Sequence, residues 1–345
     1  MPYLNHLLAG LFLLSISATS FADELSDILK RMSDADHDQN YQGTFILRKA
    51  DNLSTLKVTH GVDEGGDWEN LQSLSGEPRN IYRRNKQVVS VYPDREIITI
   101  RYTDEKRALH QRLPDNFDQL KLFYTMERLD DDRIANHHAI VVDLIPKDQY
   151  RYGYRYWIDN DTGMLLRFDL YDEQKSVIEQ MMFTSLDYLA EPPAEAFDLK
   201  KFDRFKQQNI KEDTAEMSGE KVYWAVNTLP RGFMLTQSIM RHSGSDKLQP
   251  DEDSLAPPVT SFIDEPVEPT IHDDDLLHMV YSDGLASVSV FIEKNRGASS
   301  HLQGAASMGA VNAYGQPIDG YFVTVVGEVP ASTVQVMAQS TVKLP

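Results

Sequence analysis

The stretch Tyr150–Tyr171, YRYGYRYWIDNDTGMLLRFDLY, constrains the fold more than any other part of the chain. From Tyr150 to Ile158 every second residue is aromatic or aliphatic, and side chains alternate between the two faces of a β-strand. Asp159–Gly163 then supplies turn residues, and Gly163 can adopt a positive φ. A second alternating run follows the turn. We therefore predict a long antiparallel hairpin with a broad aromatic and aliphatic surface.

This hairpin surface allows two interpretations. Rows of aromatic side chains most often form the core of a sheet. The sharper interpretation is that part of the surface lines a cavity for an apolar molecule. The candidates for that cavity are Tyr152, Tyr154, Tyr156, Trp157, Leu166 and Phe168. The alternation does not decide which face of the hairpin lines it.

Residues 23–199 read as further strands with two helices. Asp23–Asp38 has apolar residues at helical spacing, and a short helix is predicted within Leu113–Glu127. Strands are predicted at Tyr41–Arg48, Leu56–His60, Arg79–Tyr102, Ala139–Leu144 and Val177–Ser185. The expected fold class is α+β and mainly antiparallel β. We expect a half-open β-barrel with helices over an apolar cavity, because a curved sheet under helical cover leaves such a space.

Residues 1–22 are predicted to be a signal peptide. Leu7–Ala18 is a short apolar or small-residue run, and Ser20 and Ala22 are small residues at the −3 and −1 positions of a cleavage site. We therefore expect the mature chain to be exported. The chain has no cysteine, which excludes disulfides and thiolate sites. Its net charge of −19 argues against nucleic acid as a partner, because phosphate binding needs a basic surface.

A change in composition divides the chain after the first domain, 23–199. We predict a linker at 200–218, which is polar and rich in Lys and Glu, and a smaller α+β domain at 219–345. Within the second domain, residues 246–275 contain ten acidic residues and one basic residue, together with several prolines. Such a run favours a disordered acidic loop.

Catalytic and metal-binding motifs are not found. The sequence contains no GxSxG, HExxH, Walker or GxGxxG motif. Asp159-x-Asp161-x-Gly163 has the start of a calcium loop but lacks the later oxygen ligands. His272, the three aspartates after it and His278 are better explained as a solvated charge run. We predict no enzyme, no metal and no cofactor; an exported hydrolase with an unrecognised site is a weaker alternative.

Several passages along the chain resemble the MucB/RseB family of periplasmic sigma-E factor regulators. In chain order they are Tyr41–Phe45, Ser75–Arg84, Asp132–Ala135, Pro146–Tyr154, Trp157–Arg167, Leu229–Phe233, Tyr281–Leu285 and Val326–Pro330. The shared order of these passages carries the resemblance. The chain departs from the family pattern at Asn136, where a glycine is expected.

The resemblance implies a function that the composition alone does not. It implies a first domain similar to the lipoprotein carriers LolA and LolB, whose cavity takes acyl chains of lipopolysaccharide or mislocalised lipoprotein. The second domain would bind the periplasmic segment of a single-pass anti-sigma factor and shield it from site-1 proteolysis, until lipid weakens the complex. Candidate residues for that contact are Trp224, Phe233, Tyr281, Leu285 and Tyr321.

A periplasmic lipid or lipoprotein carrier of LolA type is the alternative function. The extra domain argues against it, because a carrier needs only the barrel. Self-association into a homo-oligomer is compatible with either function.

Overall fold

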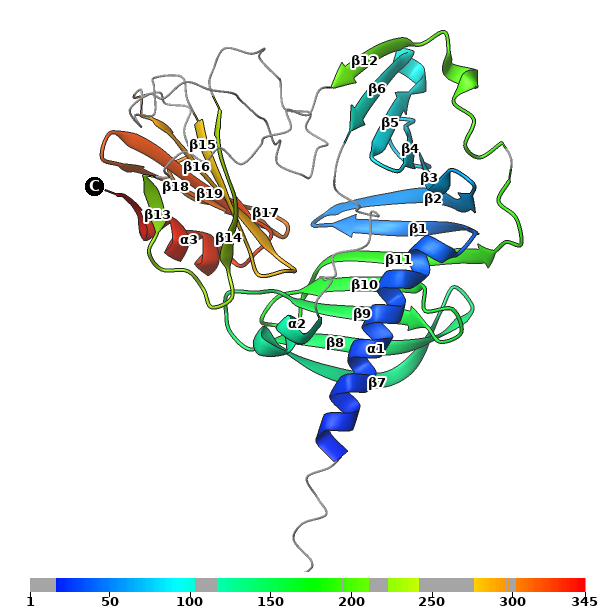
Figure 1. Cartoon of the computed structure of the whole chain (residues 1–345), viewed down its shortest axis with the longest axis horizontal. Helices are drawn as coiled ribbons and strands as arrows, with labels where there is room; N and C mark the ends of the chain where they lie inside the picture. Colours follow the sequence, from blue (N-terminus) through cyan, green and yellow to red (C-terminus); the bar gives the residue numbers. More distant parts are fainter. Residues whose placement is uncertain are drawn as a thin grey trace, which may run out of the picture.

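The computed structural model describes residues 17–102, 117–193, 195–210, 223–241, 276–295, 297 and 302–344. Its strands form sheets of twelve, six and two strands. The two larger sheets lie side by side, and helix α1 (Ser17–Asp38) crosses one of them (Figure 1). All strand pairs of the described chain are antiparallel except one, which confirms the mainly antiparallel β class.

The twelve-stranded sheet, called here the first sheet, is open. Its end strands β12 and β7 are not paired with each other in the described chain. Across the sheet the strands are β12 (Lys206–Ile210), β6 (Ile97–Tyr102), β5 (Gln87–Tyr92), β4 (Asn80–Arg84), β3 (Gly66–Ser73), β2 (Asn52–Asp63), β1 (Tyr41–Lys49), β11 (Val177–Tyr188), β10 (Leu165–Tyr171), β9 (Gly153–Asp159), β8 (His137–Pro146) and β7 (Tyr124–Ile134). The 3-10 turn η1 (Pro93–Arg95) joins β5 to β6.

The predicted hairpin is confirmed as β9 and β10. Phe168 stands opposite Tyr156 in the register, and Gly163 adopts a φ of +83° in the turn. The first strand is shorter than predicted, because it begins at Gly153 and residues 150–152 lie outside the sheet. This departure brings Tyr150–Tyr152 to the second sheet, as described below.

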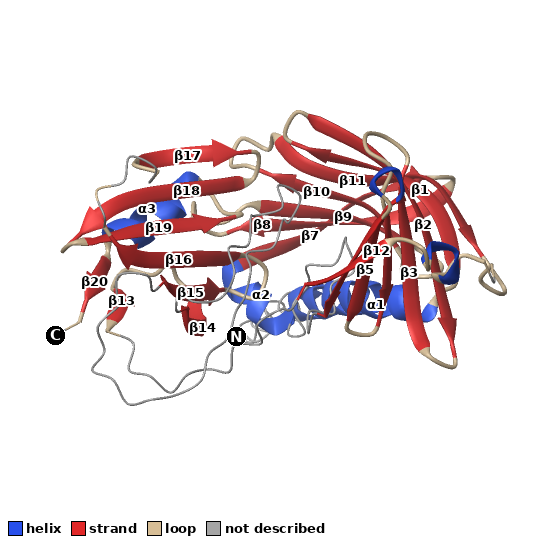
Figure 2. Ribbon diagram, turned by 90° about the horizontal axis from the view of Figure 1, so that it is seen from above, coloured by secondary structure: helices blue, strands red, loops and turns tan. Residues whose placement is uncertain are grey.

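Helix α1 confirms the helix predicted at Asp23–Asp38 and begins earlier, at Ser17. Leu25, Leu29 and Met32 recur on one side of the helix, and all three are buried against the first sheet. Figure 2 shows α1 lying along one face of that sheet. The apolar stripe of the helix is therefore what holds it there.

One local prediction is wrong, and one strand was not predicted. The short helix α2 (Phe117–Phe123) ends at Phe123, and Tyr124 and Met126, which we assigned to it, begin strand β7. Strand β7 was missed because it is a charged edge strand with no apolar alternation, although it pairs with β8 along its length. At the end of β7, Asn136 adopts a φ of 72°, so the residue that replaces glycine still provides the left-handed turn.

The first part of the predicted linker 200–218 has regular structure. Residues 200–202 form the 3-10 turn η2 (Lys200–Phe202), and β12 pairs in parallel with β6. Phe202 is buried beside Tyr82, on the face of the first sheet opposite to α1. This burial holds the segment on the sheet. Residues 211–218 lie outside the described residues, and the division at 199 and 219 stays a prediction.

The six-stranded sheet, called here the second sheet, has strands β14 and β17 at its edges. Its order is β14 (Met234–Arg241), β15 (Leu276–Ser282), β16 (Ser287–Lys294), β19 (Tyr321–Gly327), β18 (Val311–Ile318) and β17 (Gly304–Met308). The sequence predicts a helix at Ala331–Ser340, with Val334, Val336 and Met337 on it. It forms as α3 (Ala331–Gln339), which buries Val334 and Met337 against the second sheet. Strands β13 (Trp224–Val226) and β20 (Thr341–Lys343) form the small sheet.

Several predictions concern residues that the structure does not describe. Residues 1–16 of the predicted signal peptide and the acidic loop 246–275 lie outside the described residues.

Candidate functional site

Aromatic side chains gather on the face of the first sheet that α1 crosses. We call the surface formed by Tyr154, Tyr156, Phe168, Phe183 and Phe45 the aromatic face. The rings of Tyr154 and Tyr156 are stacked with centroids 6.3 Å apart, and that of Phe168 lies 5.6 Å from Tyr156. Phe45 and Phe183 meet edge to face at 5.5 Å. Ring pairs at such distances stabilise one another beyond simple burial.

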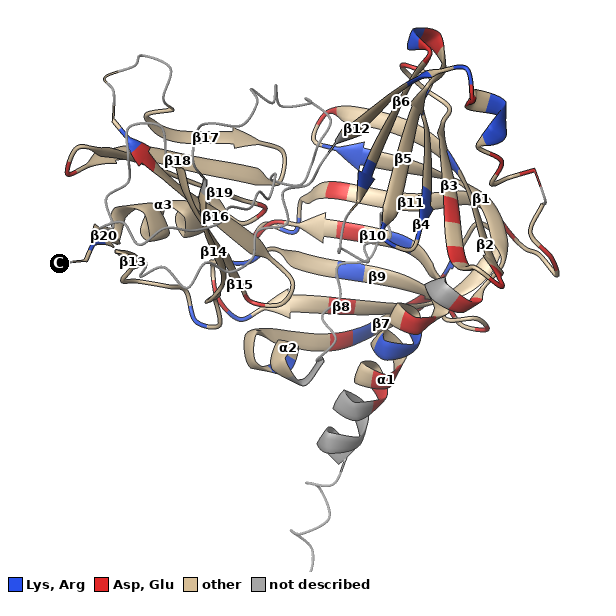
Figure 3. Cartoon of the chain, turned by 45° about the horizontal axis from the view of Figure 1, so that its top comes forward, with Lys and Arg blue, Asp and Glu red and all other residues tan. Residues whose placement is uncertain are grey.

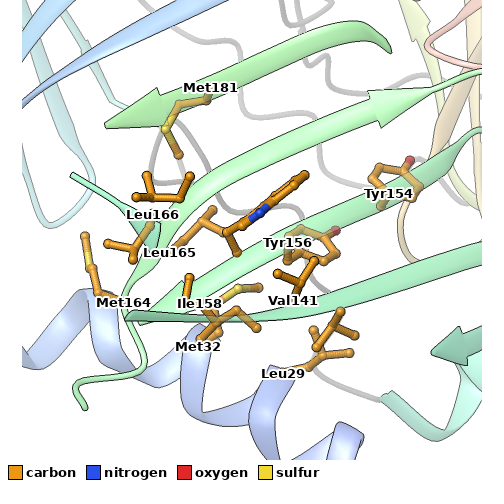
Figure 4. Packing of buried hydrophobic residues seen from close by; sticks show 14 of the residues in the cluster. Leu29, Met32, Val141, Tyr154, Tyr156, Ile158, Met164, Leu165, Leu166 and Met181 are labelled. Atoms are coloured by element: carbon orange, nitrogen blue, oxygen red, sulfur yellow. The ribbon is translucent and has the colours of Figure 1, made fainter. Parts of the chain in front are cut away.

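Helix α1 covers only part of the aromatic face. Leu29 and Met32 of the helix lie near the hairpin in Figure 4, where Tyr154 and Tyr156 occupy neighbouring positions. Tyr154 and Tyr156 are fully buried, whereas Phe168 is only half-buried. Phe168 is therefore the place where the aromatic face reaches the surface.

Tyr124 adds a polar group to this apolar surrounding. Its ring meets Tyr154 edge to face at 6.0 Å, and its hydroxyl is buried without a hydrogen-bond partner among the described residues. Burial raises the pKa of the Tyr124 hydroxyl well above its ordinary value, and the neighbouring Tyr154 and Asp283 raise it further. This tyrosine therefore stays neutral and keeps a hydrogen to donate.

The opposite face of the hairpin is polar and structural. The Trp157 indole donates to Asp132 at 2.9 Å, and the Arg167 guanidinium lies 4.0 Å from the centre of the indole ring. Tyr171 donates to Asp143 at 2.8 Å, and Arg155 pairs with the same carboxylate at 2.9 Å. Trp157 thus lies away from the aromatic face.

The turn between the hairpin strands uses its carboxylates internally. Asp159 accepts hydrogen bonds from the backbone N–H groups of Asp161 and Thr162 and from the Tyr188 hydroxyl. His137 lies 3.0 Å from the same carboxylate. In the described part of the chain no group of three acidic or histidine side chains is arranged to hold a metal ion.

Arg151 connects the two sheets. It lies in the loop between β8 and β9, and its side chain is 0% exposed. Its Nε donates to Asp283 of the second sheet at 2.7 Å, while its other nitrogens donate to Asp148 and to the carbonyl oxygen of Arg231. The guanidinium also lies 5.2 Å from the ring centre of Phe233. A single side chain therefore contacts both sheets through an ion pair, hydrogen bonds and an aromatic ring.

Further contacts surround Arg151, and we call residues 148–152 with their partners the junction. Tyr152 accepts a hydrogen bond from Asn312 at 2.9 Å, and Thr333 donates to the carbonyl oxygen of Tyr150 at 2.9 Å. Leu285 and Ala310 of the second sheet belong to the hydrophobic core of the first. Three passages with the family resemblance, at 146–154, 229–233 and 281–285, meet here.

The six cavity candidates are thus divided among different places. Tyr154, Tyr156 and Phe168 lie together on the aromatic face. Leu166 is buried in the core at a bulge of β10, Trp157 lies on the opposite face and Tyr152 lies in the junction. Sequence alternation placed Tyr154, Tyr156 and Phe168 together. It did not single out Phe45 or Phe183, and it missed Tyr124, whose strand has no apolar pattern.

The five partner-binding candidates are all buried. Trp224 and Tyr321 pack on each other at 5.2 Å, and Tyr281 belongs to the same core. Phe233 and Leu285 lie in the junction. His278 is likewise buried, bonded to Ser289.

The exposed apolar residues of the second sheet lie on its edge strands. They are Met234 and Leu235 on β14, which are 60% and 47% exposed, and Met308 on β17, at 73%. Figure 3 shows few charged residues on the strands of this sheet. No alternation marks these residues in the sequence, and we did not predict them. No helix among the described residues is long and apolar enough to cross a membrane.

Comparison with known proteins gives matches along most of the chain. The model of the MucB/RseB N-terminal domain matches residues 24–203, and that of the MucB/RseB C-terminal domain matches residues 218–342. The sigma factor AlgU regulatory protein MucB of Pseudomonas aeruginosa is 31% identical over 335 residues, covering 95% of this chain and 93% of that protein. The sigma-E factor regulatory protein RseB of Haemophilus influenzae is 26% identical over 341 residues, 94% of each.

Solved structures of MucB have the same fold. The Pseudomonas aeruginosa MucA/MucB complex aligns with a TM-score of 0.67 at 27% identity, over 93% of this chain and 99% of that one. A crystal structure of MucB in complex with MucA(peri) aligns with a TM-score of 0.65 over the same shares. The two matched family models and the relative that is 31% identical show that this chain belongs to the MucB/RseB family.

Proposed function

We propose that this chain is a periplasmic regulator of the sigma-E envelope stress response. It binds the periplasmic segment of a single-pass membrane anti-sigma factor and shields that segment from site-1 proteolysis. The observation that carries the proposal is the match, over 93% of the chain, to MucB in complex with MucA(peri). The relatives are named as regulatory proteins, which supports a binding role and not catalysis.

The second sheet is the proposed contact for the anti-sigma factor. Because Trp224, Phe233, Tyr281, Leu285 and Tyr321 are buried, they would act as support for the contact surface. The exposed Met234 and Leu235 on edge strand β14 would make the contact itself. An edge strand offers unpaired backbone groups to an extended peptide, and its exposed side chains provide selectivity.

A cleavage assay tests the proposed function. The mature chain is mixed with the periplasmic segment of the cognate anti-sigma factor and the site-1 protease, and the rate of cleavage is measured. We expect cleavage to slow in proportion to the bound fraction. Equal rates with and without this chain would show that the proposed function is wrong.

Paired variants locate the contact. Leu235→Glu places a charge in the proposed contact and should abolish protection. Leu53→Glu makes the same change at a residue of β2 that is 64% exposed, and should leave protection unchanged. Equal protection by both variants would place the contact elsewhere.

The first sheet is the proposed lipid-sensing part. We propose a half-open barrel in which acyl chains of lipopolysaccharide or mislocalised lipoprotein lie against the aromatic face and weaken the complex. The open sheet, the half-buried Phe168 and the burial of apolar surface that an acyl chain gains there support this proposal. Saturable binding of a dansyl-labelled fatty acid, displaced by lipid A, is the expected result. No saturable binding would refute the lipid-sensing role.

A lipid carrier of LolA type is the second candidate function, and the aromatic face is what favours it. The carrier would transfer lipoprotein between membranes without slowing cleavage of the anti-sigma factor. The cleavage assay above therefore separates the two functions. Sedimentation of the purified chain tests the proposed homo-oligomer.

A further inference from the structure

The Arg151–Asp283 pair joins residues that are 132 positions apart in the sequence. Both side chains are 0% exposed, and their atoms lie 2.7 Å apart. Asp283 also accepts the backbone N–H groups of Leu285 and Ala286, at 2.9 and 2.8 Å, so that its turn holds the carboxylate in place. A buried charge with fixed partners tolerates one geometry only, because any separation leaves both charges without water.

Phe123 supplies the apolar side of this contact. The Arg151 guanidinium lies 4.7 Å from the centre of the Phe123 ring. The same ring packs on the backbone of Gly232, where an added Cβ would lie 2.3 Å from it. Phe123 therefore contacts both Arg151 and Gly232, which lies in the loop before β14. A shift of its ring disturbs both contacts.

Tyr124 follows Phe123 in the chain and contacts the aromatic face. Its ring lies 6.0 Å from Tyr154 on the aromatic face. Phe123 ends α2 and Tyr124 begins β7, so the two residues are adjacent at the boundary of two elements. A single peptide unit thus joins the residue that contacts Arg151 to the residue that contacts Tyr154.

We propose that Arg151 and Asp283 form a latch that holds the second sheet against the first, and that Phe123–Tyr124 connects this latch to the aromatic face. An acyl chain that enters beside the half-buried Phe168 and reaches Tyr154 displaces Tyr124, moves Phe123 off Arg151 and opens the junction. The coupling half of this proposal rests on the proposed lipid-sensing function. The latch half does not, since it concerns the chain alone.

The latch is tested by the distance between two spin labels in the full mature chain. The chain has no cysteine, so Val62→Cys on β2 and Met308→Cys on β17 place the labels uniquely at exposed residues. We expect one narrow distance distribution. Asp283→Asn and Arg151→Met should each add a second population with a roughly tenfold rise in the open fraction, since a broken buried charge pair exceeds that factor.

A matched control removes an exposed ion pair. Arg95→Met deletes a pair with Glu77 in which the side chains are 61% and 40% exposed, and should leave the distribution narrow. Asp283→Asn keeps the side-chain oxygen that accepts the turn's N–H groups, so the turn is expected to fold. An unchanged distribution in folded Asp283→Asn overturns the latch.

The coupling is tested by adding the dansyl-labelled fatty acid to the labelled chain. Opening of the wild-type junction by the probe is expected. Phe123→Leu should bind the probe equally, but adding the probe should open its junction no further than it is without the probe. If Phe123→Leu opens like the wild type, the connection through Phe123 is wrong. If the probe does not bind the wild type, the lipid-sensing function and the coupling both fail, and the measurement without probe still decides the latch.

Discussion

Tyr124 and Tyr171 are both buried tyrosines, yet their hydroxyl groups have opposite surroundings. The Tyr124 hydroxyl has no hydrogen-bond partner among the described residues. The Tyr171 hydroxyl donates to Asp143 at 2.8 Å and accepts from Lys175 at 2.9 Å. A buried polar group without a partner destabilises the folded chain, whereas a bonded one is costly to remove.

Tyr124→Phe and Tyr171→Phe should therefore shift stability in opposite directions. We expect Tyr124→Phe to raise the free energy of unfolding by about 1 kcal/mol, and Tyr171→Phe to lower it by about 1–3 kcal/mol. Urea unfolding followed by circular dichroism measures both. Each variant is the control for the other, because both remove a single buried hydroxyl. Loss of stability in Tyr124→Phe would show that its hydroxyl has a partner in solution.

At the scale of secondary-structure elements, the edges of the first sheet depend on packing from outside the sheet. Among the described strands, β12 pairs only with β6. Its neighbour η2 anchors it through Phe202, which lies beside Tyr82 and Phe205. The polar sequence of residues 200–210 gives no sign of this role. One aromatic side chain thus decides whether the segment belongs to the sheet.

Phe202→Ala should release this segment while the rest of the sheet stays folded. Loss of a buried phenylalanine costs about 3–5 kcal/mol, so local opening should rise roughly 100-fold or more. Trypsin digestion followed by mass spectrometry measures cleavage after Arg204 and Lys206. Leu53→Ala deletes an exposed side chain and should leave cleavage at these sites unchanged. Equal cleavage in both variants would mean that β12 is held by backbone pairing alone.

At the scale of the whole molecule, tyrosines of both sheets share one electrostatic property. Burial is the largest cause that raises the pKa of Tyr124, Tyr152, Tyr171, Tyr188 and Tyr281. Below the ordinary tyrosine pKa of about 10 both the folded and the unfolded chain keep these protons. Above it the unfolded chain loses them first, which favours unfolding.

We therefore expect the free energy of unfolding to fall as pH rises above about 10. Urea midpoints measured from neutral to alkaline pH test this expectation. Tyr188→Phe should make the fall shallower, because the pKa of Tyr188 is raised by burial and by its bond to Asp159. A fall of unchanged slope in Tyr188→Phe would show that other groups cause it.

The sequence by itself determined the hairpin, the mainly antiparallel sheet, helices α1 and α3 and the family. These features rest on local periodicity, turn residues and the order of short passages, all of which are visible along the chain. It did not reveal the edge strands β7, β12, β14 and β17, which are paired on one side only and carry no regular apolar alternation. It also missed the interior strand β3, whose residues are mostly polar.

Only the tertiary structure decided which residues of the hairpin act together. Alternation placed Tyr152 with Tyr154 and Tyr156. Strand β9 begins only at Gly153, however, and Tyr152 instead bonds to Asn312 of the second sheet. Arg151 gained its role in the same way. Its partner Asp283 lies in a distant turn, and a charge pair between distant residues leaves no periodic signal in a sequence. Packing brought these two residues together, and burial gave the contact its strength.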